Sequence, residues 1–422
     1  MNRRNLLRVV LPVAMPAVED SAGAAAKSSG GIRWDFLGGR LGGAERLSPA
    51  HFRCELQGDV DQNGRNRQAN WYYFRVDGVR GLDLTIDLVK LPGEYNFVPN
   101  RGAVTADTIP VYSRDNRVWL PVPKTEYDAS EPRLRLHIPA ESRTVWIAHV
   151  PPYTEQHLSR LLATLSALPQ VRVRSIGKTV EHRRIPLVTV TDPEVPARKK
   201  KCVWLMFRQH GWETGSSWAG EGALRLLTGS EPRAASLRER FIWKIIPMCD
   251  PDGVARGNVR FNKYGFDLNR NWDVEDPVRM PEITAQRRAV LDWLERGGRV
   301  DLFLSLHNTE TGEYLEGPGG PLLQRFHEVL RARSTFDPTT PPRVMDPRFD
   351  SGRATVIQGL HARRGIPAFL MEQRISWNAR LGRLPTLHDR MEFGAGLVSA
   401  IAETLEPGFH AASEPEGQGC TS

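Results

Sequence analysis

Residues 52–149 alternate apolar and polar positions in short runs. Clusters of glycine, asparagine, aspartate and proline separate the runs, and a period of two is typical of strands with one buried face. The clearest runs are residues 71–76, 82–86, 134–138 and 144–148. Several short strands at this spacing predict an all-β sandwich. We therefore assign residues 32–150 to an N-terminal β-sandwich domain.

The pattern changes after Pro151 and Pro152. The apolar spacing of residues 154–168 predicts an amphipathic helix, with Thr154 as its N-cap residue and His157 at position N3. Apolar runs that predict buried strands then alternate with helical patterns. The predicted strands are 202–207, 300–306 and 366–371, and the predicted helices are 221–227 and 284–296. This alternation predicts an α/β domain with a mixed or largely parallel central sheet over residues 151–407.

The two ends of the chain differ from both predicted domains. Residues 2–8 read NRRNLLR and resemble a twin-arginine export signal, followed by an apolar stretch at 9–18 and small residues at 22–26. Two prolines interrupt that stretch and two acidic residues follow it, which favours a cytoplasmic leader instead. By a narrow margin we expect export over a cytoplasmic location. We assign residues 1–31 to this leader and a flexible linker, and residues 408–422 to a disordered tail.

Composition narrows the class of function. Of 422 residues, 40% are hydrophobic and 25% charged, as in an ordinary soluble globular protein. No apolar run approaches the roughly 20 residues that span a membrane, so we expect no membrane partner. The net charge of +8 suits a carboxylate-bearing partner, and because the basic residues are scattered we expect no nucleic-acid partner. The 4 cysteines form no CxxC pair, which excludes a cysteine-rich zinc finger.

A candidate metal site begins with an HxxE element, His210 and Glu213, just after the buried run 202–207. About one His-x-x-acid pair is expected by chance in a chain of this composition, so position matters more than the pair itself. The element falls in a polar loop at a strand end, where ligands gather in open α/β sheets. His307 ends another apolar run. At the tip of a buried strand, a purely structural histidine is the alternative to a metal ligand. Together the three residues form the His₂Glu set of a catalytic Zn²⁺ site, one ion per chain.

The segment between the two halves of this set is rich in glycine, asparagine and aspartate and contains two arginines, Arg260 and Arg270. Arginine is a fixed donor suited to carboxylates and oxyanions. The neighbouring pair Asn269 and Arg270 is therefore a candidate carboxylate clamp. The alternative is a turn-rich surface loop with solvated arginines.

At this point the chain resembles the M14 family of zinc carboxypeptidases, in its cytosolic-carboxypeptidase-like branch. The motifs that carry the resemblance are RQHGWET (208–214), PDG to NRNW (251–272), SLH (305–307) and FLME (369–372). NWYYFRV (70–76) and PPYT (151–154) extend it into the β domain, so that it covers roughly residues 45–405. The resemblance implies a zinc carboxypeptidase-like α/β catalytic domain preceded by the β sandwich. It also implies a metallopeptidase that acts on peptide or protein C-termini.

The same resemblance implies roles for individual residues. His210, Glu213 and His307 would hold Zn²⁺, and Glu372 would be the catalytic base. Arg260 would stabilise the carbonyl oxyanion. Asn269 and Arg270 would bind the terminal carboxylate of the substrate.

This sequence departs from the branch at Gly211, where proline is usual, and at Asp250, where asparagine is usual. The family's substrate-capping tyrosine has Tyr314 as a candidate by residue type. SGRAT (351–355) resembles the stretch that supplies a basic specificity residue, which makes Arg353 the candidate. An arginine buried there would favour acidic C-terminal residues. The alternative is a solvated surface arginine.

Two other functions compete with this interpretation. One is a zinc amidohydrolase that acts on small N-acyl amino acids, which shares the HxxE…His geometry. The other is a non-catalytic binding module, which would be expected to have lost a ligand or the base, whereas all four residues are present.

Overall fold

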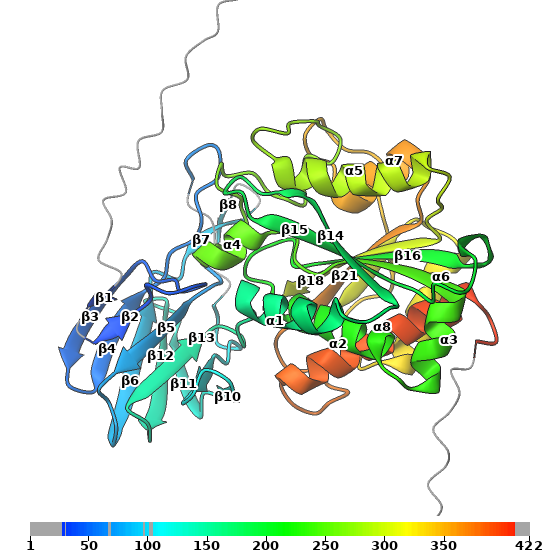
Figure 1. Ribbon diagram of the computed structural model, residues 1–422. Coiled ribbons are helices and arrows are strands. Elements are labelled where there is room, and N and C mark those ends of the chain that lie inside the picture. The colour runs from blue at the N-terminus through cyan, green and yellow to red at the C-terminus, as the bar shows by residue number, and fades with distance from the viewer. Residues whose placement is uncertain (1–27, 30, 66–68, 96–97, 101–103, 410–422) are drawn as a thin grey trace, which may run out of the picture.

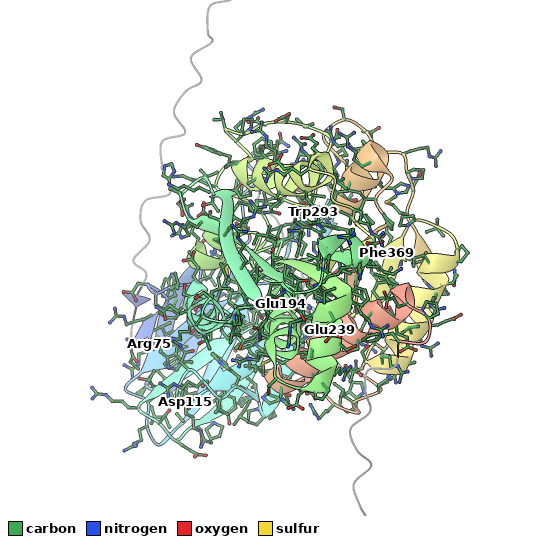
Figure 2. All side chains as sticks on the ribbon, turned by 45° about the vertical axis from the view of Figure 1, so that its right-hand side comes forward. Arg75, Asp115, Glu194, Glu239, Trp293 and Phe369 are labelled. Carbon is green, nitrogen blue, oxygen red and sulfur yellow. The ribbon has the colours of Figure 1, made fainter. Side chains whose placement is uncertain are left out.

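The computed structural model describes residues 28–409 except 30, 66–68, 96–97 and 101–103. The blue-to-cyan β part and the green-to-red α/β part lie side by side (Figure 1). The fold is thus an all-β sandwich followed by an α/β domain with a mixed sheet, as predicted. In Figure 2, Arg75 and Asp115 mark the β part, and Trp293 and Phe369 mark the α/β part. The predicted export signal lies outside the described residues.

The β part is built from two facing sheets. One sheet has the order β1-β2-β5-β13-β9-β10 and is antiparallel throughout. Its strands are Ser28–Ser29, Ile32–Arg33, Tyr73–Asp77, Thr144–Ala148, Val111–Ser113 and Leu120–Pro121. The other has the order β11-β12-β6-β4-β3. Its strands are Lys124–Asp128, Arg133–Ala140, Leu82–Val89, His51–Glu55 and Gly43–Ser48.

Alternation of side chains explains this core. Leu134, Leu136 and Ile138 of β12 are buried, whereas the residues between them are partly exposed. Strand residues two apart point to the same face, so the apolar sets of the two sheets meet. A short hairpin of β7 (Gly93–Tyr95) and β8 (Val98–Asn100) stands beside the sandwich.

The α/β part contains a mixed sheet with the order β14-β15-β17-β16-β18-β21-β19-β20. Strands β17, β16, β18 and β21 are mutually parallel, and the strands flanking them on both sides are antiparallel to them. From the β14 edge, the strands are Val171–Lys178, Arg184–Val190, Phe241–Ile246, Lys201–Phe207, Leu302–Thr309, Ala368–Arg374, Tyr314–Gly317 and Arg343–Val344. The central strands are buried along almost their whole length because helices cover both faces of the sheet.

Helices on the two faces contribute to separate apolar cores. The first face carries α1 (Glu155–Leu165), α2 (Thr214–Thr228), α3 (Pro232–Arg240), α6 (Pro321–Arg333) and α8 (Leu387–Leu405). The other face carries α5 (Pro281–Glu295) and α7 (Val356–Arg364), at the top of Figure 1. The short helix α4 (Pro251–Arg256) lies toward the β part, and a 3₁₀ turn covers Ala197–Lys199. No helix in the described part of the chain is long and apolar enough to cross a membrane.

Helix α1 has the expected capping box between Thr154 and His157. Other predicted elements have different ends in the structure. Strands β18 and β21 run past their predicted ends, because they continue to pair as far as Thr309 and Arg374. As a result Glu372 lies within a strand rather than at its end.

The predicted linker and tail are wrong at their inner margins. Strand β1 lies inside the predicted linker and pairs with β2, Ser29 opposite Ile32. Phe409 is 4% exposed and packs against Phe241, with 6.2 Å between ring centroids, because an apolar ring at this position completes the core beneath α8. Residues 410–422 lie outside the described part of the chain.

An aromatic cluster joins the two parts of the molecule. Trp71 and Tyr73 of the β part are buried together with Trp212 of the α/β part. His149 lies between Tyr72 and Trp212, with edge contacts at centroid distances of 5.2 and 5.9 Å. Neither ring nitrogen of His149 has a hydrogen-bond partner among the described residues, and burial lowers its pKa to about 3.

His149 should make the protein sensitive to acid. Its folded-state pKa lies below the unfolded value of about 6.5, so the stability associated with the neutral ring is complete above about pH 6.5 and is lost as pH falls toward 3. At pH 5 the penalty is about 2 kcal/mol, at roughly 1.4 kcal/mol per pKa unit. The variant His149→Phe has no ring nitrogen to protonate, so this penalty is absent. Urea denaturation at pH 8 and pH 5 should show the variant gaining about 2 kcal/mol relative to the wild type. An equal loss in both proteins would contradict this account.

Candidate metal centre and active site

The first two candidate ligands, His210 and Glu213, come from the loop that connects β16 to α2. Arg208 starts this loop in the left-handed region at φ +57°, and its buried guanidinium donates to the Gly211 carbonyl from Nε at 2.9 Å and Nη2 at 2.6 Å. Glu213 is the N-cap residue of α2. A Cβ at position 211 would lie 2.4 Å from the Asn258 carbonyl oxygen. That close approach explains the glycine at this position.

His307 and Glu372 come from adjacent parallel strands. They are direct register partners on β18 and β21. Strand β16 pairs in parallel on the other side of β18, with Phe207 opposite Leu306. The loop after β16 therefore begins beside His307, and the sheet brings the distant sequence motifs together.

Glu213 lies between the two candidate histidine ligands. Its Oε1 is 2.6 Å from Nδ1 of His210, and its Oε2 is 3.0 Å from Nδ1 of His307. The three ligand atoms all lie within 4.8 Å of one another, and each residue is at most 2% exposed. The far ring nitrogens also have partners. Nε2 of His210 lies 3.1 Å from Asp267 Oδ1, and Nε2 of His307 lies 3.0 Å from Ser305 Oγ.

This arrangement fits a metal ion. A histidine that donates from Nε2 presents a lone pair at Nδ1, and here that lone pair faces a carboxylate, which is also an acceptor. Despite its closeness to His307, Glu213 Oε2 has no hydrogen-bond partner in the described chain. Two imidazoles and one carboxylate around a buried point are the donor set that zinc takes in catalytic sites. The Asp267 carboxylate behind His210 is the outer partner that orients such ligands.

The charges of the two buried glutamates are set differently. Burial alone would raise the pKa of Glu213, but His210 and His307 reverse the effect and lower it to about 2. Burial, with the negative charge of Glu213 nearby, raises the pKa of Glu372 well above its usual range. Glu372 Oε2 is buried without a hydrogen-bond partner among the described residues. Two carboxylates thus face the same site with opposite proton affinities, a pattern typical of acid–base sites.

Two aspartate carboxylates position Arg260, one by binding its side chain and the other by binding the backbone of its loop. Its Nε donates to Asp267 Oδ2 at 2.7 Å, so Asp267 links Arg260 to His210. The loop around Arg260 is held from the β part by Asp59, whose Oδ2 accepts from the backbone N–H groups of Val259, Arg260 and Phe261 at 2.8, 2.7 and 3.2 Å. Asp59 is 5% exposed. A single carboxylate of the sandwich therefore fixes the backbone beneath Arg260.

Asn269 and Arg270 follow in the same segment. Asn269 Oδ1 accepts from the Val356 N–H at 2.9 Å, which connects this segment to the start of α7. Arg270 Nη1 donates to the Asn269 carbonyl at 2.8 Å. The two side chains are thus positioned by the segment itself and by α7.

A cavity of about 480 Å³ brings most of the predicted site residues together. His210, Glu213, Arg260, Asn269, Arg270, Tyr314 and Glu372 all line it. His307 lies buried behind them. Arg353 does not line the cavity and is exposed, because the irregular stretch before α7 leaves its side chain at the surface.

Four further residues of this region were not found from the sequence. Asp59 and Asn70 belong to the β part, and Asn70 Nδ2 donates to Glu310 Oε1 at 3.0 Å. Glu310 and Glu316 line the cavity. Asn70 opens the NWYYFRV motif, but no sequence signal marks Asp59 or links either residue to its partner, because the partners lie 200 or more positions away. Glu316 could have been found from the sequence. It follows Tyr314 by two residues in a short alternating run, so the two side chains share a face of the strand.

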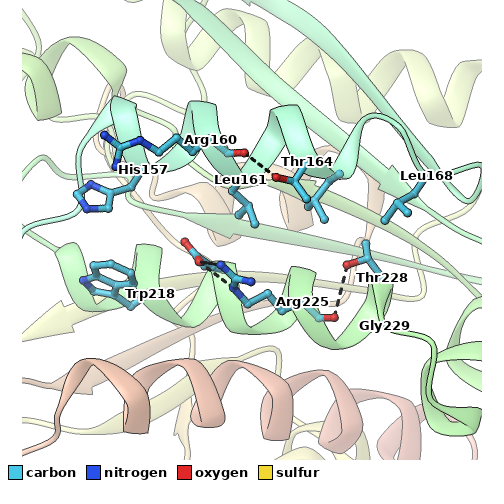
Figure 3. Close-up of a pocket in the computed structure, with 11 residues that line it drawn as sticks. His157, Arg160, Leu161, Thr164, Leu168, Trp218, Arg225, Thr228 and Gly229 are labelled. Atoms are coloured by element: carbon cyan, nitrogen blue, oxygen red, sulfur yellow. Dashed lines mark hydrogen bonds and ion pairs between the residues drawn. The ribbon is translucent and has the colours of Figure 1, made fainter. Parts of the chain in front are cut away.

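A second cavity, of about 440 Å³, lies between α1 and α2 (Figure 3). Two of its polar side chains, His157 and Arg225, already have partners within the chain. His157 is part of the α1 capping box, and Arg225 pairs with Glu221 at 2.6 Å. None of the candidate site residues lines this cavity. The chemistry is therefore assigned to the first cavity.

Comparisons with known proteins agree with this geometry. A family model described as zinc carboxypeptidase matches residues 158–314, and one described as the cytosolic carboxypeptidase N-terminal domain matches residues 32–150. The chain belongs to the M14 family of zinc carboxypeptidases, in the branch that carries this N-terminal domain. The first match ends before Glu372, so the position of that residue depends on the strand register described above.

Individual relatives extend the likeness along the chain. Mouse cytosolic carboxypeptidase 6 is 29% identical over 292 residues, covering 65% of this chain and 52% of the relative. A metallo-carboxypeptidase from Burkholderia cenocepacia matches with a TM-score of 0.75 at 25% identity, covering 88% of this chain and 98% of that one. A Pseudomonas aeruginosa metallo-carboxypeptidase in complex with (2-guanidinoethylmercapto)succinic acid matches with a TM-score of 0.74 at 25% identity, covering 89% and 99%. The chain covers 58% of a curated relative from Zymomonas mobilis, 52% of the mouse relative and 15–34% of other curated cytosolic carboxypeptidases.

Removing the Asp59 carboxylate should loosen the Arg260 loop. In Asp59→Ala three backbone N–H groups lose their acceptor, and an unsatisfied buried donor costs about 1–3 kcal/mol. We expect Asp59→Ala to be destabilised by at least about 2 kcal/mol in chemical denaturation. Asp59→Asn keeps one acceptor oxygen and should recover part of the loss. Equal stability of Asp59→Ala and the wild type would show that the loop does not depend on this carboxylate.

Proposed function

We propose that this protein is a zinc-dependent metallocarboxypeptidase that hydrolyses the C-terminal peptide bond of peptides or proteins. The observation that carries the proposal is the shared cavity. Asn269 and Arg270, suited to a terminal carboxylate, line the same space as His210, Glu213 and Glu372. A hydrolase that acts within a chain would have no use for a carboxylate clamp beside its reacting groups.

The chain's residues divide the reaction between them. His210, Glu213 and His307 would hold Zn²⁺, which would supply Lewis-acid chemistry and make a nearby water more acidic. Glu372 accepts the proton of the attacking water and returns it to the nitrogen of the departing residue. Arg260, fixed by Asp267, donates to the carbonyl oxygen as negative charge develops there.

Substrate binding is assigned to the neighbouring segment. Arg270 and Asn269 bind the terminal carboxylate, which places the last peptide bond beside Glu372. The ligand named for the P. aeruginosa relative joins a succinic acid to a guanidino group, so that relative accepts a molecule with carboxylates at one end and a cation at the other. This supports a site that binds free carboxylates.

The acidic preference predicted from Arg353 has weaker support. Arg353 is exposed outside the cavity, so it is not placed to meet the side chain of the departing residue. Peptides that differ only in a C-terminal Glu, Lys, Phe or Ala test the preference directly. A set of N-acyl amino acids tests the competing amidohydrolase function, since cleavage of these alone would replace the proposal.

Activity should depend on both the metal and Glu372. Glu372→Gln keeps the shape of the side chain but removes the proton acceptor, so we expect kcat to fall by at least about 100-fold while bound zinc is retained. A chelator should abolish cleavage and added zinc should restore it. The measurements are C-terminal trimming by mass spectrometry and zinc content by elemental analysis.

The exposed residue Glu392 provides a matched control, since Glu392→Gln makes the same change of charge at the surface. It should leave activity unchanged. Full activity in Glu372→Gln, or purified active protein without stoichiometric zinc, would overturn the proposal.

We also propose export as the compartment, on the basis of the twin-arginine-like residues Arg3 and Arg4, whereas the word cytosolic in the names of relatives describes those proteins. In cell fractions we expect a form that has lost its first residues outside the cytoplasm. Replacing both arginines with lysine should keep the full-length chain in the cytoplasm. A full-length cytoplasmic protein in both cases would reject export.

A further inference from the structure

The cavity contains two carboxylates that the proposed reaction does not use, Glu310 and Glu316, and Glu310 accepts a hydrogen bond from Asn70. Glu316 lies on β19, lines the cavity and is half-buried. We propose that Glu316 makes this cavity select peptides that end in lysine or arginine. This substrate class rests on the carboxypeptidase function proposed above.

Strand register fixes where Glu316 lies relative to the reacting groups. Strands β18, β21 and β19 are neighbours, and residues two apart on a strand share a face. The cross-strand partners on the cavity face form a first row of His307, Glu372 and Tyr314. They form a second row of Ser305, Leu370 and Glu316. The second row is about 7 Å from the first along the strands, two residues at roughly 3.4 Å each.

The second row lies deeper in the sheet. Ser305 and Leu370 precede His307 and Glu372 in their parallel strands, so the row lies away from the carboxyl-end edge that carries the metal ligands. The side chain of a departing residue must extend from the reacting centre into the cavity. Glu316 is therefore positioned to meet the far end of a long side chain, in a cavity that Leu370 and Thr355 also line.

Among the described residues, none is a partner of the Glu316 carboxylate. It makes no hydrogen bond or ion pair within the described part of the chain. Arg343 lies opposite it on β20, but the guanidinium of Arg343 stacks on the Tyr314 ring, with Cζ 3.4 Å from the ring centroid. Burial raises the pKa of Glu316, while the charges of Arg343 and Arg270 oppose the shift. A half-buried carboxylate without a partner is stabilised by a cation from a ligand.

The other charged side chains that line the cavity are engaged, apart from Glu372, which is the proposed base. Among the described lining residues the cations are Arg260, paired with Asp267, and Arg270, bonded to the Asn269 carbonyl. Glu310 accepts from Asn70. Glu213 faces the two histidines. Glu316 is the acid left to recognise a substrate.

Lysine and arginine satisfy this site best. Each has an aliphatic stem that can lie along Leu370 and a terminal cation that can pair with Glu316. A C-terminal glutamate would bring a second negative charge to an unneutralised carboxylate, which disfavours it. Phenylalanine or leucine would cover the carboxylate without pairing it.

The proposal is tested with peptides identical except for a C-terminal Lys, Arg, Glu, Phe or Ala. With zinc-loaded wild-type protein, we expect kcat/KM for Lys and Arg to exceed that for Glu and Phe by at least about tenfold. Glu316→Gln, a change without loss of volume, should remove the advantage and retain cleavage of the Ala peptide. Glu316→Lys should favour Glu over Lys. Glu392→Gln is the surface control, with the wild-type preference.

A binding measurement separates recognition from catalysis. Free lysine and norleucine differ in the terminal ammonium group, so calorimetry should give lysine the higher affinity in the wild type. The difference should disappear in Glu316→Gln. Circular dichroism and zinc content identify any variant that has failed to fold.

The possible failures are distinguishable. If no peptide is cleaved by the zinc-loaded wild type, the proposed function itself fails. If peptides are cleaved with a preference for Glu or Phe, or if a Lys preference survives in Glu316→Gln, the carboxypeptidase function stands and the role of Glu316 is rejected.

Discussion

The site depends on one constraint, the parallel pairing of β16, β18 and β21. Parallel neighbours end at the same edge of a sheet, so the loop after β16 and the ends of β18 and β21 must meet. This brings His210 beside His307, and places Glu372 directly opposite His307. The same register continues into β19 and determines which residues face the cavity below them. Neither the ligand cluster nor the deeper row would survive a shift of one residue, because every side chain would change face.

A buried cluster of charges imposes the second requirement. Glu213 is ionised between two imidazoles whose nitrogens are oriented from outside by Asp267 and Ser305. Such a cluster is stable when a cation completes it, and costly otherwise. The β part contributes to holding this arrangement, since Asp59 holds the Arg260 loop and Trp212 packs among aromatic rings of the sandwich. The sandwich is therefore part of the support of the active site.

The features that could be predicted from the sequence are those that depend on residues close together in the chain. The strand at 144–148 has the bounds of β13, and the capping box of α1 was visible in two residues. The three candidate ligands were readable because each stands next to an apolar strand. The partnership of Asp59 with the Arg260 loop was not readable, since it joins residues about 200 positions apart and an isolated aspartate in a loop has no distinguishing pattern. The extension of β21 past Glu372 was missed for a related reason, because pairing with β18 and β19 decides where it ends.

The contrast between Arg353 and Glu316 shows which sequence arguments transfer to a structure. Arg353 was identified because SGRAT (351–355) resembles a family stretch, but that stretch is irregular here, and small differences in a loop redirect a side chain to the surface. Glu316 is connected to Glu372 through a strand ladder. Tyr314 pairs directly with Glu372, and Glu316 follows Tyr314 by two residues. A ladder has a fixed repeat, so the direction of its side chains follows from the register alone. For the charge proposed to select the substrate, strand register is thus a stronger guide than a short local resemblance in a loop, and here register indicates a negative charge.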